Sequence, residues 1–169
     1  MIISGKVHVL GDNVDTDGMI PGRFLALSEP KEIARHIFEE IDPSFIKRVQ
    51  PGDIIVAGKN FGQGSGREQA PLGLIGLGVG CIVATSFART FFRMAVDLGL
   101  HTVECPEAFR AAKDGDLAHV DTKTGLVRIA SQEFRSTPLP DFIREIVDGG
   151  GIVPWIKSES ARRAAAGRA

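Results

Sequence analysis

The segment whose residue types are best suited to binding or catalysis is a glycine-rich run at residues 58–71. It holds one hydroxyl, Ser65, and one guanidinium, Arg67, between glycines at 62, 64 and 66. Glycine permits positive φ and lets the backbone approach a ligand closely. Free N–H groups at a following helix start attract anions, and an arginine can hold a carboxylate through two hydrogen bonds. The run therefore predicts a site for a small anion, with a carboxylate as the natural ligand of Arg67.

A purely structural interpretation of the same run stays open. Ser65 and Glu68 have the S-x-x-E spacing of a capping box, in which the serine would only satisfy N–H groups at a helix start. The run is not a P-loop, because no Lys-Ser or Lys-Thr closes it and its glycines do not follow G-x-G-x-x-G. A nucleotide phosphate is therefore the weaker hypothesis for the ligand.

A second polar loop, at residues 11–22, carries Asp12, Asp15 and Asp17. Asx turns and a helix cap would explain these carboxylates without any function. A calcium loop is disfavoured, because Phe24 stands where the bidentate glutamate should be. Carboxylates near a loop serine could instead orient a substrate or a catalytic partner.

Regular elements must position these two loops. Apolar alternation and buried runs predict strands at 2–10, 53–57, 80–85, 101–104, 117–120 and 125–129. Periodicity predicts helices at 30–46, from 71 onward, at 86–98 with Thr85 or Ser86 as cap, at 106–113 and at 141–147. Helices interleaved with strands, followed by a β-rich stretch, indicate one α/β domain with a mixed sheet. We expect this domain to span 1–157 and the Ala- and Arg-rich tail, 158–169, to be disordered.

Composition limits the classes of partner. The chain has 169 residues, 43% of them hydrophobic, and a net charge of −1. A near-neutral charge argues against a general role on nucleic acid or at a membrane surface. The first residues do not resemble a signal peptide and no apolar run approaches about 18 residues, so we expect a cytoplasmic protein. Two cysteines, Cys81 and Cys105, cannot complete a zinc or iron–sulfur site, so any metal centre must come from another chain.

Several motifs together carry a family resemblance. The segments 13–17, 58–68, 84–89 and 149–154 occur in the order, and at about the spacing, of small subunits in the aconitase superfamily. Over nearly its whole length the chain resembles 3-isopropylmalate dehydratase small subunits. The resemblance implies a single swivelling β/β/α domain like the C-terminal domain of aconitase. It also implies a separate large subunit that carries a [4Fe-4S] cluster, in a heterodimer or heterotetramer, with no cofactor or metal site in this chain.

The resemblance implies a hydro-lyase of leucine biosynthesis, which isomerises 3-isopropylmalate and 2-isopropylmalate by dehydration and rehydration. Ser65 would be the catalytic base, and its alkoxide would need nearby N–H groups and a cation. Arg67 would supply that cation and bind a substrate carboxylate. Asp17 matches an aspartate that supports a catalytic histidine of the other subunit, although Asp15 is close enough to compete for this role.

The chain departs from the family's usual Ser-Ser-Arg-Glu-His run. Here the run is Ser65-Gly66-Arg67-Glu68-Gln69, so one hydroxyl that would hold substrate is missing and a histidine is replaced. The backbone N–H of Gly66 could substitute for that hydroxyl. We expect Gly64 and Gly66 to contribute to the substrate site.

The loop Phe24-Leu25-Ala26-Leu27 aligns with the loop that selects substrate in related enzymes. Members that use tricarboxylates tend to carry an arginine at the position of Ala26. An apolar loop can bury an alkyl group but cannot neutralise a third carboxylate, which favours isopropyl- or methyl-substituted malates. Nearby Arg23 keeps homocitrate or homoaconitate open. Another alkyl-malate such as 2,3-dimethylmalate, or a non-catalytic regulatory role, are the remaining alternatives.

Overall fold

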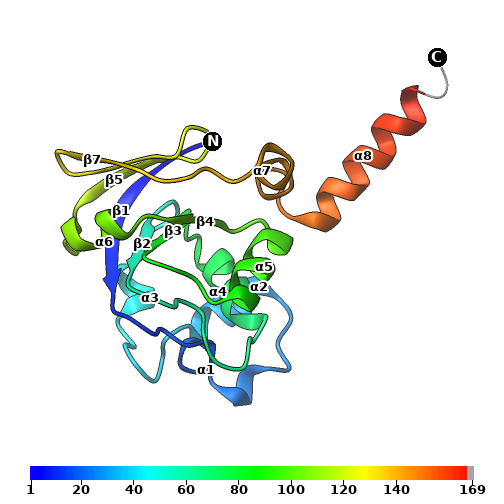
Figure 1. Cartoon of the computed structure of the whole chain (residues 1–169). Coiled ribbons are helices and arrows are strands. Elements are labelled where there is room, and N and C mark those ends of the chain that lie inside the picture. The colour runs from blue at the N-terminus through cyan, green and yellow to red at the C-terminus, as the bar shows by residue number, and fades with distance from the viewer. Residues whose placement is uncertain (167–169) are drawn as a thin grey trace.

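The fold is built around β1 (Ile2–Leu10), a long strand shared by two halves of one sheet (Figure 1). The computed structural model describes residues 1–166. Within these residues the sheet has seven strands in the order β4-β3-β2-β1-β5-β6-β7. The other strands are β2 (Ile54–Ala57), β3 (Cys81–Ala84), β4 (His101–Glu104), β5 (Leu117–Asp121), β6 (Leu126–Ile129) and β7 (Gln132–Arg135).

The two halves of the sheet differ in strand direction. Toward its carboxyl end β1 pairs in parallel with β2, starting at Val7 opposite Ile54, and β3 and β4 continue the parallel half. Toward its amino end β1 pairs antiparallel with β5, Ile2 lying opposite Asp121. Strands β2 and β3 are buried throughout, as expected for parallel strands covered on both faces. The prediction of one α/β domain with a mixed sheet is confirmed.

Helices cover both faces of the parallel half. The helices of the described residues are α1 (Thr16–Met19), η1 (Gly22–Phe24), α2 (Pro30–Ile33), η2 (Ala34–His36), α3 (Phe45–Arg48), α4 (Gln69–Leu77), α5 (Arg89–Leu98), α6 (Pro106–Ala111), α7 (Asp141–Asp148) and α8 (Ile152–Ala166), and α8 projects away from the sheet (Figure 1). Along β2, Ile55 and Ala57 join the core formed with α4 and α5, while Ile54 and Val56 join the core on the face of α6. The alternation follows from the two-residue period of a strand.

The carboxyl ends of the parallel strands place both polar loops at one edge of the sheet. The loop at 11–15 follows β1, and the loop at 58–68 follows its neighbour β2. Open α/β sheets generally bind ligands at this edge. Sequence-distant segments therefore meet where a site is expected.

One predicted helix is wrong. Residues 30–46 do not form a continuous amphipathic helix, because the helical turns of α2 and η2 end at His36 and Phe38 adopts a φ of 58°. The amide of Phe38 donates to the carbonyl of Met19 at 2.8 Å, and its side chain is buried in the core. Tertiary contacts thus replace the helical bond expected from periodicity.

The start of α5 and the C-terminal segment also differ from expectation. Helix α5 begins at Arg89 without a side-chain cap, because the Ser86 hydroxyl accepts from the amide of Asn60 at 2.9 Å. Residues 158–166, expected to be disordered, continue α8, consistent with the high helix propensity of Ala, Arg and Glu. The remaining part of the predicted tail, 167–169, lies outside the described residues. Strand β7 was not predicted.

Candidate active site

The two polar loops lie side by side and are joined by backbone hydrogen bonds. The amide of Gly62 donates to the carbonyl of Val14 at 2.7 Å, and the amide of Thr16 donates to the carbonyl of Gln63 at 2.9 Å. The pairing extends outward, since the amide of Asn13 donates to the carbonyl of Lys59 at 2.8 Å. These bonds fix the glycine-rich loop against the acidic loop.

Thr16 is the buried anchor of this junction. Its side chain has no exposed surface. Its hydroxyl donates to the carbonyl of Gln63 at 3.2 Å and accepts from the amides of Gly66, at 3.1 Å, and Arg67, at 3.3 Å. One hydroxyl therefore satisfies three backbone groups on both sides of Ser65.

The side chains of Ser65 and Arg67 both contact one carboxylate oxygen of Asp17. The Ser65 hydroxyl donates to Oδ1 of Asp17 at 2.5 Å, and Nη2 of Arg67 lies 2.7 Å from the same oxygen. The amide of Ser65 donates to Oδ2 at 3.2 Å. The hydrogen bonds from Ser65, together with the charge of Arg67, lower the pKa of Asp17. The carboxylate is therefore ionised at neutral pH and accepts from a serine that is exposed at the surface.

Positive φ angles at two glycines make this convergence possible. Gly64 has a φ of 91°, and a Cβ there would lie 2.7 Å from Oδ2 of Asp17. Gly66 has a φ of 70°, and a Cβ there would lie 2.9 Å from a methyl of Thr90. A serine at position 66 would be strained, which accounts for the glycine in this chain. The amide of Gly66 donates inward to Thr16, so a substrate contact from Gly66 stays a prediction.

The structural alternatives for these residues can be compared with the geometry. Asp15 caps α1, its Oδ1 accepting from the amide of Gly18 at 2.5 Å, which leaves Asp17 as the carboxylate that meets Ser65. The capping box is not formed, because Glu68 is the N-cap of α4 and makes no side-chain cap bond. The Ser65 hydroxyl is bonded to a carboxylate and not to a helix amide.

Arg67 and Gln69 connect the site to the predicted substrate loop. Nη1 of Arg67 donates to the carbonyl of Ile20 at 2.5 Å and to that of Asp17 at 3.3 Å. Together with the contact to the Asp17 carboxylate, these use three of its five N–H groups, and residues 1–166 offer the other two no hydrogen-bond acceptor. Nε2 of Gln69 donates to the carbonyl of Leu25 at 2.8 Å.

The four residues of the substrate loop divide into two pairs. Phe24 and Leu27 are half-buried and pack against the core. Leu25 and Ala26 are exposed. Only Leu25 and Ala26 therefore present apolar surface that a ligand could contact from outside.

Arg23 is already neutralised by protein carboxylates. Its guanidinium forms ion pairs with Glu39 and Glu40 and lies 4.7 Å above the ring of Phe24. Phe24 in turn stacks on His36, with ring centroids 3.7 Å apart. This arrangement weakens the case for Arg23 as the partner of a third substrate carboxylate.

The cysteines lie in the core, away from these loops. Cys81 and Cys105 are both buried on the face of α6, and burial raises the pKa of the Cys81 thiol to about 12. Across residues 1–166 no three His, Cys, Asp or Glu side chains gather to form a metal site. In the same residues no helix is long and apolar enough to cross a membrane.

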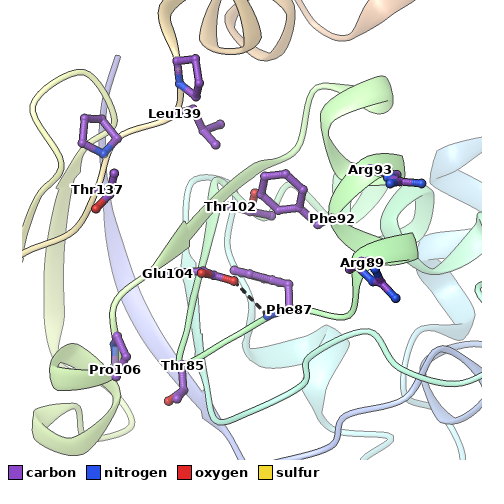
Figure 2. A pocket seen from close by; sticks show the side chains of 12 residues that line it. Thr85, Phe87, Arg89, Phe92, Arg93, Thr102, Glu104, Pro106, Thr137 and Leu139 are labelled. Atoms are coloured by element: carbon purple, nitrogen blue, oxygen red, sulfur yellow. Dashed lines mark hydrogen bonds between the residues drawn. The ribbon is translucent and has the colours of Figure 1, made fainter.

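A separate groove of about 620 Å³ opens between α5 and the segment 137–140 (Figure 2). Phe87 and Phe92 line it, and the amide of Phe87 donates to Glu104 at 3.4 Å. Arg89 and Arg93 reach it from α5, with guanidinium groups directed away from the two rings in Figure 2. The groove shares no residue with the cluster of Ser65, Asp17 and Arg67. Its volume alone therefore does not identify it as the catalytic site.

Some of these participants were not predicted from the sequence. Thr16 and Gln69 act on backbone atoms of distant segments, and no local spacing indicates such contacts. The available signals were the position of Thr16 between two aspartates and the replacement of the family's usual histidine by Gln69.

Comparisons with known proteins give the same picture. A family model described as the aconitase C-terminal domain matches residues 42–108. The 3-isopropylmalate dehydratase small subunit of Caldicellulosiruptor bescii is 45% identical over 161 residues, covering 94% of this chain and 97% of its own length. That of Halothermothrix orenii is 48% identical over 159 residues, covering 93% and 96%. The isopropylmalate/citramalate isomerase small subunit of Methanocaldococcus jannaschii is 44% identical over 162 residues, covering 95% and 96%.

Solved structures share this fold over nearly all or part of the chain. The crystal structure of a 3-isopropylmalate dehydratase from Methanocaldococcus jannaschii superposes with a TM-score of 0.91 at 38% identity, covering 98% of this chain and 99% of that one. Aconitase X from Thermococcus kodakaraensis, at 18% identity, has a TM-score of 0.54 over 78% of this chain and 92% of its own, and shares the fold alone. The resemblance predicted from the sequence motifs is confirmed: this chain belongs to the family of 3-isopropylmalate dehydratase small subunits.

Proposed function

We propose that this chain is the small subunit of an enzyme that interconverts 3-isopropylmalate and 2-isopropylmalate, with Ser65 as the catalytic base. The observation that carries the proposal is that Ser65 and Arg67 both contact the same carboxylate oxygen of Asp17. The names of relatives at 45% and 48% identity support the same reaction in leucine biosynthesis.

The chain's own residues can perform the proton transfer. The Ser65 alkoxide would take a proton from the carbon next to a substrate carboxylate, and the C–H electrons would form a double bond as the C–O bond on the neighbouring carbon breaks. The departing hydroxyl would take a proton from the histidine of the large subunit that the family resemblance implies, and would leave as water. Before the reaction the Ser65 hydroxyl donates to Asp17; once that proton has passed to solvent, Arg67 beside it stabilises the negative charge of the alkoxide. A [4Fe-4S] cluster in the large subunit would supply the Lewis acid for the hydroxyl. Re-addition of water in the opposite sense completes the isomerisation.

The substrate is an alkyl-substituted malate. The two free N–H groups of Arg67 suit a carboxylate, while Leu25 and Ala26 offer apolar surface to an alkyl group. Because Arg23 is paired with Glu39 and Glu40, we assign the homocitrate alternative less weight. A methyl-substituted malate is the second candidate, supported by the relative named isopropylmalate/citramalate isomerase.

A large subunit is the partner implied by membership of this family. We propose that it carries the cluster and that the two chains form a heterodimer or heterotetramer. A location in the cytoplasm stays a prediction.

The test is turnover of 3-isopropylmalate by the chain produced anaerobically with its large subunit, comparing the native protein with Ser65→Ala. Loss of a general base lowers kcat by about 10²- to 10⁴-fold, while complex formation should be retained. Ser131→Ala, an exposed serine far along the chain on the β6–β7 turn, is the matched control and should turn over normally. Full activity in Ser65→Ala would refute the catalytic role. Activity in neither protein, with an intact cluster, would move the assignment to another alkyl-malate or to a regulatory subunit.

A further inference from the structure

Gln69 links the catalytic loop to the substrate loop. It is the first residue of α4 and lies two positions after Arg67. Its side-chain amide crosses to the carbonyl of Leu25, at 2.8 Å and 44 residues away in sequence. This carbonyl follows the last residue of η1, where a short helix leaves its terminal acceptors without internal donors.

The opposite side of the same loop is held by aromatic and ionic contacts. Phe24 lies between the ring of His36 and the guanidinium of Arg23, and Glu39 bonds both of those groups. These contacts fix Phe24 but do not reach Leu25 or Ala26. Beyond Phe24 the amide of Leu25 donates to the carbonyl of Gly22 at 3.3 Å, the amide of Leu27 donates to the carbonyl of Phe24 at 3.0 Å, and the Leu27 side chain packs against the core. Among the described residues, the bond from Gln69 is the one side-chain hydrogen bond that joins residues 25–26 to the catalytic loop.

We propose that Gln69 is a positioning residue that sets the distance between the carboxylate-binding Arg67 and the apolar surface of Leu25 and Ala26. This inference rests on the function proposed above. An apolar wall discriminates between alkyl groups only by about 1–3 kcal/mol per methylene, and only if the wall stays in place. Because Gln69 and Arg67 belong to one segment, the bond to Leu25 makes the spacing between the two ligand contacts rigid. Gln69 thereby selects for the larger alkyl group without touching the substrate.

The test replaces the donor and measures selection as well as rate. In the complex with the large subunit, Gln69→Leu should raise KM for 3-isopropylmalate by about 5- to 10-fold, the value of one neutral hydrogen bond, with kcat within about threefold. The preference for the isopropyl over the methyl substrate should fall by a similar factor. Gln69→Glu, which keeps the size but cannot donate at neutral pH, should behave like Gln69→Leu. Gln132→Leu, the same change at an exposed glutamine on β7, should match the native protein.

A second measurement does not depend on turnover. In the full-length chain alone, hydrogen exchange of the amides at 25–27 should accelerate in Gln69→Leu and Gln69→Glu but not in Gln132→Leu. Unchanged exchange would show that the bond from Gln69 does not hold residues 25–27, and it would overturn the proposal even if the native complex were inactive. Accelerated exchange with an unchanged substrate preference in an active complex would overturn the role in selection. Inactivity of the native complex would instead count against the proposed function.

Discussion

At the scale of single residues, Thr16 shows how much of the site depends on one side chain that is not expected to touch substrate. Its hydroxyl contacts Gln63, Gly66 and Arg67, on both sides of the serine. We expect Thr16→Val to remove the acceptor of the half-buried amides of Gly66 and Arg67, while the carbonyl of Gln63 keeps the bond from the amide of residue 16. Loss of this acceptor should cost about 1–3 kcal/mol of the free energy of unfolding. Chemical denaturation of the isolated chain measures this loss.

The same variant should also slow catalysis, because the loop that carries Ser65 loses its anchor. Thr16→Ser keeps the hydroxyl and removes only a methyl group, so it should retain the position of the loop and most of kcat. If Thr16→Val and Thr16→Ser have equal kcat, the hydroxyl does not position Ser65.

Asp17 and Ser65 illustrate what the residue types alone could predict. The motifs predicted that a serine, an arginine and an aspartate serve one site, and the structure brings the three side chains together. The motifs favoured Asp17 but left Asp15 as a competitor, because the two lie only two residues apart. The choice depends on a local bond, in which Asp15 is used to cap α1.

At the scale of elements, the packing of α5 against the glycine-rich loop makes Gly62 indispensable. Gly62 has a φ of 82°, and a Cβ there would lie 2.1 Å from Cγ of Phe91, which is fully buried. We expect Gly62→Ala to destabilise the fold by about 2–5 kcal/mol, from backbone strain and overlap with the ring. Thermal or chemical unfolding measures the effect.

Gly115→Ala separates these two causes. Gly115 has a φ of 89°, but no atom lies within 4 Å of its would-be Cβ. The Gly115→Ala variant should be destabilised by backbone strain alone, at about 1–2 kcal/mol of the free energy of unfolding. Equal losses in the two variants would show that contact with Phe91 does not contribute.

The elements were predictable where one local signal dominates. Strand Ile2–Leu10 alternates around Val7 and Val9 and was found at the predicted bounds. The prediction of a helix at 30–46 was wrong. Ile33, Ile37 and Phe38 have helical spacing, but the chain turns at Phe38, where the backbone is held by a hydrogen bond to Met19. Strand β7, at Gln132–Arg135, is polar and pairs at the edge of the sheet with β6, so its sequence carries no apolar pattern. Tertiary partners decide such segments.

At the scale of the whole molecule, His101 couples stability to pH. It lies buried on β4, and burial lowers its pKa although Asp148 lies 3.7 Å away and opposes the shift. The unfolded chain therefore binds a proton at higher pH than the folded chain does. Stability is full above about pH 6.5 and falls as the pH drops below that value, with a slope of at most about 1.4 kcal/mol per pH unit.

Denaturation between pH 8 and pH 5 tests this linkage. His101→Gln removes the titrating group, so its stability should decline less steeply over the range, whatever its stability at pH 8. An equal slope in the native protein and the variant would assign the acid sensitivity to other groups.

The double pairing of β1 also has a consequence for synthesis. Its carboxyl half pairs with β2, which is synthesised about fifty residues later. Its amino half pairs with β5, so Ile2 has no partner until Asp121 has been synthesised. At roughly 5–20 residues per second, a ribosome needs on the order of 6–24 s to deliver that partner. During this interval the amino half of the strand leaves the tunnel with unpaired backbone groups and an open edge. We therefore expect fragments that stop before β5 to aggregate, because they leave the edge of β1 that pairs with β5 open.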